Sequence, residues 1–179
     1  MITEDTTDDL QRFETPDEAF QYIRYVGTQE DAEIDLAEAS IALALIFLPG
    51  LHIDRYRQHF KKLSDHVREE YESRLRLQHA DNLEMRINVL RKIIHEAHGY
   101  KGDDLTYDDI QNVNIIRVIE RRKGLPIAIG IIYMVLARSM GWQIDGLNFP
   151  GHFLIRMEMG AERMILDPFR QGQLMPASD

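Results

Sequence analysis

The chain has 179 residues, 44% of them hydrophobic, and a formal net charge of −9, which suits one compact domain or a domain with a helical N-terminal extension. The acidic balance argues against nucleic acid as the main partner, because phosphate binding draws on clustered Lys and Arg. No apolar run approaches the ~20 residues of a membrane span, and the absence of cysteine excludes disulfides and thiolate metal sites.

The first 14 residues are acidic, and we expect them to form a disordered terminus. They contain no basic segment followed by an apolar one, so we predict no secretory signal. We therefore expect a cytoplasmic protein, with neither a membrane nor nucleic acid as a partner.

Residues 15–98 are predicted to form a helical N-terminal region. Thr15, Pro16 and Glu18 form a capping-box pattern that predicts a helix start. Apolar residues at helical spacing predict three further helices, at 33–47, for about 20 residues from Asp54, and at 83–97.

Residues 99–179 differ in pattern. Residues 99–113 are rich in Gly, Asp and Asn, so we predict a loop in which Asp103, Asp104, Asp108 and Asp109 are solvated. A short helix is expected at 114–122. A longer helix begins at Pro126, ends at Gly141 and is apolar all round, which predicts burial on every side.

Strand patterns follow this central helix at 143–149, 152–157 and 163–166. Helices first and a small antiparallel sheet last predict an α+β fold in which the central helix packs on the sheet. We expect the helical region 15–98 and the core 99–179 to form one continuous structural unit.

The last two predicted strands bring a histidine and an aspartate together. A two-residue turn at Met159 and Gly160 places Phe153 opposite Leu166, and then His152 opposite Asp167. In that register the Asp167 carboxylate accepts a hydrogen bond from His152 and fixes its tautomer. An ordinary polar cross-strand pair is the competing interpretation.

His95 and His98 lie on one face at the end of the predicted helix 83–97. Two histidines without a third ligand are a weak metal signal, and histidine also interacts favourably with the negative end of a helix. We therefore predict no metal site and no cofactor.

Four segments of the sequence resemble the SirB-one family of transglutaminase-like proteins. They are DLAEAS at 35–40, VIERRKGLPI at 118–127, PGHFLI at 150–155 and ILDPF at 165–169. The resemblance implies a core related to papain-like cysteine proteases and transglutaminases. In that superfamily the central helix carries a catalytic Cys at its start, and neighbouring strands carry the His and the Asp.

The resemblance assigns His152 and Asp167 to the catalytic histidine and aspartate. The pattern Gly-x-Cys falls on Gly124, Leu125 and Pro126. Proline offers no nucleophile and removes a backbone N–H that could stabilise an oxyanion. Cysteine proteolysis and transglutamination are therefore not expected.

We predict a non-catalytic binding or regulatory module. Its cleft, formed by Gly124, Leu125, Pro126 and Gly151, would hold a peptide, a protein segment or a small ligand. The alternative is a hydrolase or acyl-transfer enzyme in which His152, oriented by Asp167, activates water as a general base.

Overall fold

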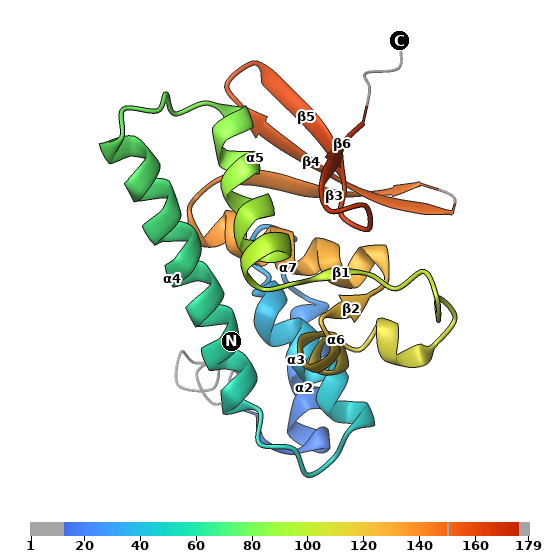
Figure 1. The fold of residues 1–179 in the computed structure, drawn as a ribbon. Helices are drawn as coiled ribbons and strands as arrows, with labels where there is room; N and C mark the ends of the chain where they lie inside the picture. The colour runs from blue at the N-terminus through green and yellow to red at the C-terminus, as the bar shows by residue number, and fades with distance from the viewer. Residues whose placement is uncertain (1–12, 150, 176–179) are drawn as a thin grey trace, which may run out of the picture.

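The fold is built around one buried helix, α7 (Pro126–Ser139), as the computed structural model shows for residues 13–149 and 151–175 (Figure 1). Helices from the first half of the chain pack around it, and an antiparallel sheet covers one side. This arrangement confirms the predicted α+β class.

The helices before α7 follow the predicted order, except that the short η2 lies within the predicted loop 99–113. They are α2 (Pro16–Val26), α3 (Leu36–Phe47), α4 (Asp54–Arg76), α5 (Leu83–Arg91), the π-helix η1 (Lys92–Ala97), the 3-10 helix η2 (Ile110–Asn112) and α6 (Ile115–Arg121). The predicted capping box is confirmed, because the Thr15 hydroxyl accepts from the Glu18 N–H and the Glu18 carboxylate accepts from the Thr15 N–H.

Two predicted helix boundaries differ from the structure. Helix α3 begins at Leu36 instead of at residue 33, because the Asp35 carboxylate accepts from the N–H groups of Ala37 and Glu38 and so caps the helix there. The predicted helix 83–97 is α5 followed by the wider π-helical turn η1.

The sheet follows α7 and is antiparallel throughout. Its strands are β3 (Gln143–Phe149), β4 (His152–Met159), β5 (Glu162–Asp167) and β6 (Gln173–Leu174), in that spatial order. Phe153 of β4 packs on α7 at Gly130, where a Cβ would overlap its ring. The predicted contact between the central helix and the sheet is therefore confirmed.

The predicted register between the last two long strands is wrong by two residues. Ile155 pairs with Leu166, and the tight turn consists of Gly160 and Ala161 instead of Met159 and Gly160. Gly160 has a φ of +61° and stands at the first central position, which a type II′ turn reserves for glycine. A shift of two residues preserves the faces of both strands, but it removes His152 from its predicted place opposite Asp167.

A short parallel pair of strands lies within the region predicted to be a loop. Strand β1 (Lys101–Gly102) pairs with β2 (Lys123–Gly124), which immediately precedes the start of α7. The Lys101 N–H donates to the Arg122 carbonyl, and the Asp103 N–H donates to the Gly124 carbonyl. This pairing joins residues 22 positions apart, so no local sequence pattern indicated it.

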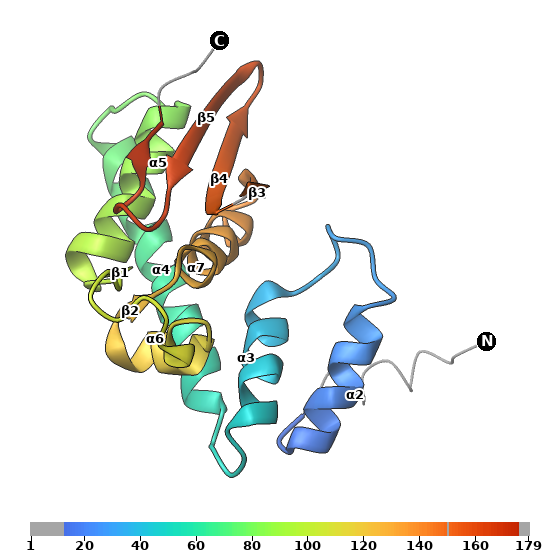
Figure 2. The same cartoon turned by 90° about the vertical axis from the view of Figure 1, so that its right-hand side faces the viewer.

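One hydrophobic core extends from Phe13 to Leu166, and it includes side chains from both the helical region and the sheet. Figure 2 shows the sheet above α7 and helix α3 below it. The predicted disordered terminus lies outside the described residues, except for Phe13 and Glu14. Among the described residues, no helix combines the length and the apolar content needed to cross a membrane.

Candidate functional site

The start of α7 is the place where the family resemblance puts the nucleophile. Pro126 is the first residue of the helix, and the preceding Leu125 provides no side-chain acceptor for the free N–H groups. Gly124 is buried, and a Cβ there would lie 2.8 Å from the Val118 Cγ2 atom. Gly124 therefore permits close packing below the surface, whereas Leu125 and Pro126 are partly exposed.

A buried polar network fixes the chain that leads into α7. The Asp103 side chain is 1% exposed, and its Oδ2 atom accepts from the Thr106 hydroxyl at 2.7 Å and from Arg121 at 2.9 Å. Arg121 also donates to the Asn112 side chain at 3.0 Å. Hydrogen bonds from Thr106, reinforced by the charges of Lys123 and Arg121, lower the pKa of Asp103. The prediction that Asp103 is a solvated loop residue is wrong.

Asp167 ends β5, and its side chain is committed to the turn that follows. The residue is 5% exposed. Its Oδ1 atom accepts from the N–H groups of Phe169 at 2.9 Å and Arg170 at 3.3 Å. The carboxylate therefore stabilises its own turn, which is the ordinary structural role of an Asp side chain in an Asx turn.

The turn after Asp167 nevertheless lies next to the segment that leads into α7. The ring of Phe169 packs on Gly102, where a Cβ would overlap it. Gly102 pairs with Gly124, two residues before Pro126. Gly172, at the end of the same turn, packs on the hydroxyl of Tyr133 in α7. The structure thus brings the Asp167 turn to the strand pair that precedes Pro126.

His152 is not part of this assembly. It is the exposed first residue of β4 and lies opposite Phe149 of β3. Because side chains alternate along a strand, it faces away from the side on which Phe153 contacts α7. Among the described residues its side chain has no hydrogen-bond or ion-pair partner. Gly151, which precedes it, is also exposed, with a φ of +78°.

The extension of the observed register puts Leu154 opposite Asp167. In that extension, which goes beyond the last observed pair of Ile155 with Leu166, His152 is a diagonal neighbour of Asp167 and not its direct partner. Among the described residues, the structure forms no hydrogen bond between His152 and Asp167. An acid–base dyad needs such a bond to orient the histidine.

His95 and His98, the two histidines considered as metal ligands, both form hydrogen bonds within the protein. His95 Nδ1 lies 2.6 Å from the Tyr100 carbonyl oxygen, and His95 Nε2 lies 2.7 Å from the Tyr133 hydroxyl. His98 Nε2 lies 2.9 Å from His66 Nδ1. Burial lowers the pKa values of His95 and His98. Within the described residues, no three His, Asp or Glu side chains are grouped as metal ligands.

An apolar groove between α3 and the η2–α6 segment was missed by the sequence analysis. It has a volume of about 590 Å³, and Ile131 of α7 contributes to its lining. Four further lining residues are unusually exposed for apolar side chains: Phe47 (77%), Ile110 (80%), Leu43 (48%) and Val113 (48%). Neither Pro126, His152 nor Asp167 lines it.

The sequence of α3 contains a pattern that could have indicated this groove. Helix α3 reads LAEASIALALIF, with Glu38 as its one charged residue. A helix that is apolar all round is expected to be covered on all sides. In the structure one side of α3 is left open at Leu43 and Phe47.

Comparison with known proteins gives a family and several partial relatives. A family model described as the transglutaminase-like superfamily matches residues 54–179. A UPF0162 protein of Xylella fastidiosa is 27% identical over 154 residues, which cover 86% of this chain and 53% of the relative. A UPF0162 protein of Vibrio cholerae is 32% identical over 99 residues, or 55% of this chain and 37% of the relative.

A mammalian protein also contains a similar segment. F-box only protein 21 of Homo sapiens is 32% identical over 83 residues, which cover 46% of this chain and 13% of that protein. The chain thus spans about half or less of the length of the relatives it matches. No solved structure gives a significant match.

Proposed function

The chain belongs to the transglutaminase-like superfamily, and on that premise we propose that it is a non-catalytic module that binds an apolar segment of a protein partner. The observation that carries the proposal is the first residue of α7. Where the superfamily pattern has its cysteine the chain has Pro126, and none of its 179 residues is a cysteine.

The two remaining members of the expected triad support the same conclusion. Asp167 uses its carboxylate in its own turn, and His152 has no partner among the described residues. A general base needs a neighbour that fixes its orientation and protonation state. The alternative, a hydrolase or acyl-transfer enzyme based on His152 and Asp167, therefore has less support.

The apolar groove is the surface best suited to the partner. Exposed apolar patches of this kind are typical of interaction sites. Ile131 lines the groove, and Ile127, one turn earlier on the same face of α7, is 46% exposed. The apolar surface therefore continues from the groove toward Leu125 and Pro126, two residues of the predicted cleft.

The chemistry of the groove specifies the partner segment. Among the twelve residues that line it, Arg117 is the one charged side chain. An amphipathic helix with apolar anchors at i, i+3 or i+4 and i+7 fits such a groove.

The lengths of the relatives support the proposal that this chain is a module of the kind found within larger proteins. The matching segment covers only 13% of F-box only protein 21, and the bacterial relatives also extend well beyond it. A domain found in such different chains is expected to contribute binding to a larger assembly.

The loss of catalysis is tested with a single engineered thiol, because the chain has no other cysteine. We expect the Pro126→Cys variant to show no ester hydrolysis or acyl transfer. We also expect its alkylation rate at neutral pH to change less than about twofold when His152→Ala is added, because a thiolate is stabilised by a histidine only when the two are in contact. Ser139→Cys, at the other end of α7, is the control. It gives the alkylation rate of a thiol on the same helix that lies away from Pro126.

A drop of about tenfold or more in alkylation rate upon His152→Ala, seen in Pro126→Cys but not in Ser139→Cys, would contradict the proposal. It would show that the Cys-His geometry has been retained.

Binding is tested by selecting amphipathic helical peptides from a random library on the full chain. We expect the selected peptides to lose at least about tenfold in affinity for Phe47→Asp and Ile110→Asp, because a charge in the groove is desolvated by the peptide. Leu105→Asp is the matched control, since Leu105 is 86% exposed and lies outside the groove. Equal binding to all three variants would overturn this choice of site.

A further inference from the structure

A second cavity, on the opposite side of α3, has aromatic walls and an excess of negative charge. It has a volume of about 620 Å³ and lies among α2, α3 and the start of α4; we name it the α2–α3 pocket. Its lining includes the rings of Phe13, Tyr22 and Tyr25. Five carboxylates also line it, from Glu14, Glu33, Asp35, Glu38 and Asp54, against the single cation of Arg57.

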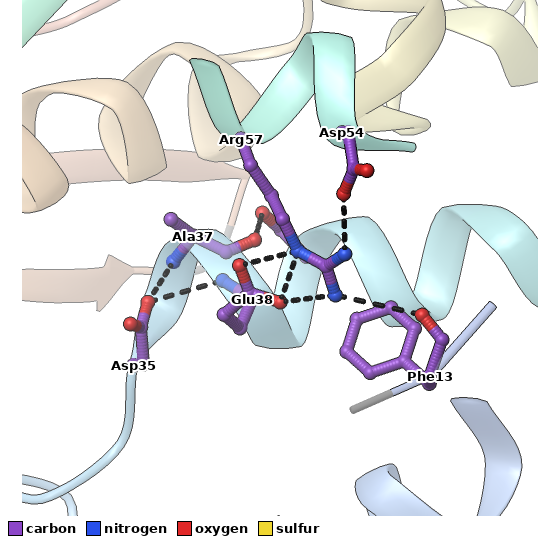
Figure 3. Close-up of polar contacts among 7 residues, drawn as sticks. Phe13, Asp35, Ala37, Glu38, Asp54 and Arg57 are labelled. Atoms are coloured by element: carbon purple, nitrogen blue, oxygen red, sulfur yellow. Dashed lines mark hydrogen bonds and ion pairs between the residues drawn. The ribbon is translucent and has the colours of Figure 1, made fainter. Parts of the chain in front are cut away.

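Arg57 neutralises two of these carboxylates and organises one wall (Figure 3). Its Nε atom donates to Glu38 at 2.9 Å, and its Nη1 atom donates to Asp54 at 3.0 Å. The guanidinium also lies over the Phe13 ring, 4.9 Å from the centroid. The pocket thus already holds one cation against an aromatic face.

The other three carboxylates have no cationic partner in the part of the chain that the structure describes. Asp35 accepts from the N–H groups of Ala37 and Glu38 through one oxygen, as Figure 3 shows. Neither Asp35, Glu33 nor Glu14 forms an ion pair with any described residue. Among the described residues, no cation therefore balances the charge of these three carboxylates.

Tyr22 presents a polar group to the pocket from a side chain that is otherwise buried. The residue is 5% exposed and lines the pocket. It stacks on Phe13 at a centroid distance of 5.1 Å. No residue in 13–149 or 151–175 forms a hydrogen bond with its hydroxyl, and the hydroxyl oxygen is accessible from the pocket. Burial, and then the charges of Asp35 and Glu38, raise the pKa of Tyr22 to about 12.

We propose that the α2–α3 pocket binds an alkylammonium cation, either the side chain of a lysine on a partner or a free polyamine. Aromatic faces attract such a cation through the ring quadrupole. The Tyr22 hydroxyl oxygen accepts a hydrogen bond from the ammonium group, while Asp35 and Glu33 balance its charge. The volume lies within the ~300–1,000 Å³ typical of small-ligand sites. This site is separate from the apolar groove and does not depend on the proposed function.

The experiment is calorimetric titration of the full chain at low ionic strength with three probes. Spermidine represents a free polyamine, Nα-acetyl-lysine amide represents a partner's lysine, and Nα-acetyl-norleucine amide is the uncharged control. We expect saturable binding of at least one cationic probe and none of the norleucine compound. Spermidine alone would identify a polyamine site, and binding of the lysine probe would identify a partner's side chain.

Variants of residues that line the α2–α3 pocket test whether the cation binds there. Asp35→Asn retains the helix cap, because asparagine caps as well as aspartate. Combined with Glu33→Gln it removes two charges, and we expect affinity to fall by about threefold to tenfold. Tyr22→Phe keeps the ring and removes only the hydroxyl, and we expect at least a twofold loss.

The control is Glu96→Gln combined with Asp104→Asn, which removes the same charge from exposed positions outside the pocket. An equal loss in this control would overturn the proposal, because the attraction would then come from the net charge of the whole chain. Binding of the norleucine compound with similar affinity, or no binding of either cation to the folded wild-type chain, would also overturn it.

Discussion

At the scale of single residues, a polar group that is partly shielded from solvent makes stability depend on pH. His59 Nε2 lies 2.8 Å from the Tyr100 hydroxyl and 2.8 Å from Arg122 Nη1. Arg122 is held in a left-handed conformation at the end of α6, with a φ of 59°. Burial, together with the nearby charge of Arg122, lowers the pKa of His59 to about 4.

This depressed pKa predicts a loss of stability in acid. The unfolded chain protonates His59 near pH 6.5, whereas the folded chain does so only near pH 4. Between these values the unfolded state binds more protons, so the free energy of unfolding falls as pH decreases from 7 to 4. Because His59 is partly exposed, we expect a discounted contribution of about 1–2 kcal/mol.

Urea unfolding of the wild type and of His59→Gln, between pH 7.5 and pH 4.5, measures this contribution. The variant is expected to lose less stability over that range. His79→Gln, in the exposed turn after α4, is the control and should follow the wild type. Identical pH profiles for His59→Gln and the wild type would show that His59 is not the responsible group.

At the scale of elements, the contact between α7 and the sheet is the tightest constraint. The Phe153 ring lies between Gly130 of α7 and Gly146 of β3, and it would overlap or crowd a Cβ at either position. A glycine inside a buried helix, such as Gly130, leaves room for a neighbouring element to approach closely. The partner of Gly130 depends on strand register and orientation, which only the tertiary structure supplies.

Gly130→Ala tests this contact. Alanine favours the helix by ~1 kcal/mol, but overlap with Phe153 is expected to reverse the sign and destabilise the protein by about 1–3 kcal/mol. Adding Phe153→Leu should restore part of the loss. Gly27→Ala is the control, because Gly27 has a φ of −64° and a Cβ there would meet its nearest neighbour at an ordinary 3.5 Å. Chemical denaturation measures the free energy of unfolding of the wild type, the two single variants and the double variant. A Gly130→Ala variant more stable than the wild type would contradict the packing argument.

At the scale of the whole molecule, the helical region and the sheet share one core. Trp142, at the start of the sheet, is 5% exposed and packs edge-on against Tyr71 of α4 at a centroid distance of 5.2 Å. Arg86 of α5 lies over the same indole ring, at 5.3 Å. The sequence-based division at residues 98 and 99 therefore does not coincide with a break in packing.

We expect the chain to unfold in one cooperative transition. Far-UV circular dichroism reports mainly on the helices, and fluorescence of the one tryptophan, Trp142, reports on the junction of α4, α5 and the sheet. Their thermal midpoints should coincide, as a shared core requires. Two separated midpoints would indicate that residues 15–98 and 99–179 are independent domains.

The sequence by itself determined most of the helices and strands and the identity of the residue at the start of α7. Signals such as the Thr15 capping box, the proline at position 126 and the glycine at 141 act within one or two turns of chain, so they can be recognised without knowledge of the fold. The motif spacing likewise indicated the family and the absence of a nucleophile.

Only the tertiary structure decided which side chains meet. The two-residue register difference separated His152 from its predicted place opposite Asp167, because the conformation of Gly160 set the turn. The α2–α3 pocket and the apolar groove are formed by segments far apart in the chain. Contacts of this kind depend on the packing of whole elements, whereas helix caps and turns depend on a few neighbouring residues.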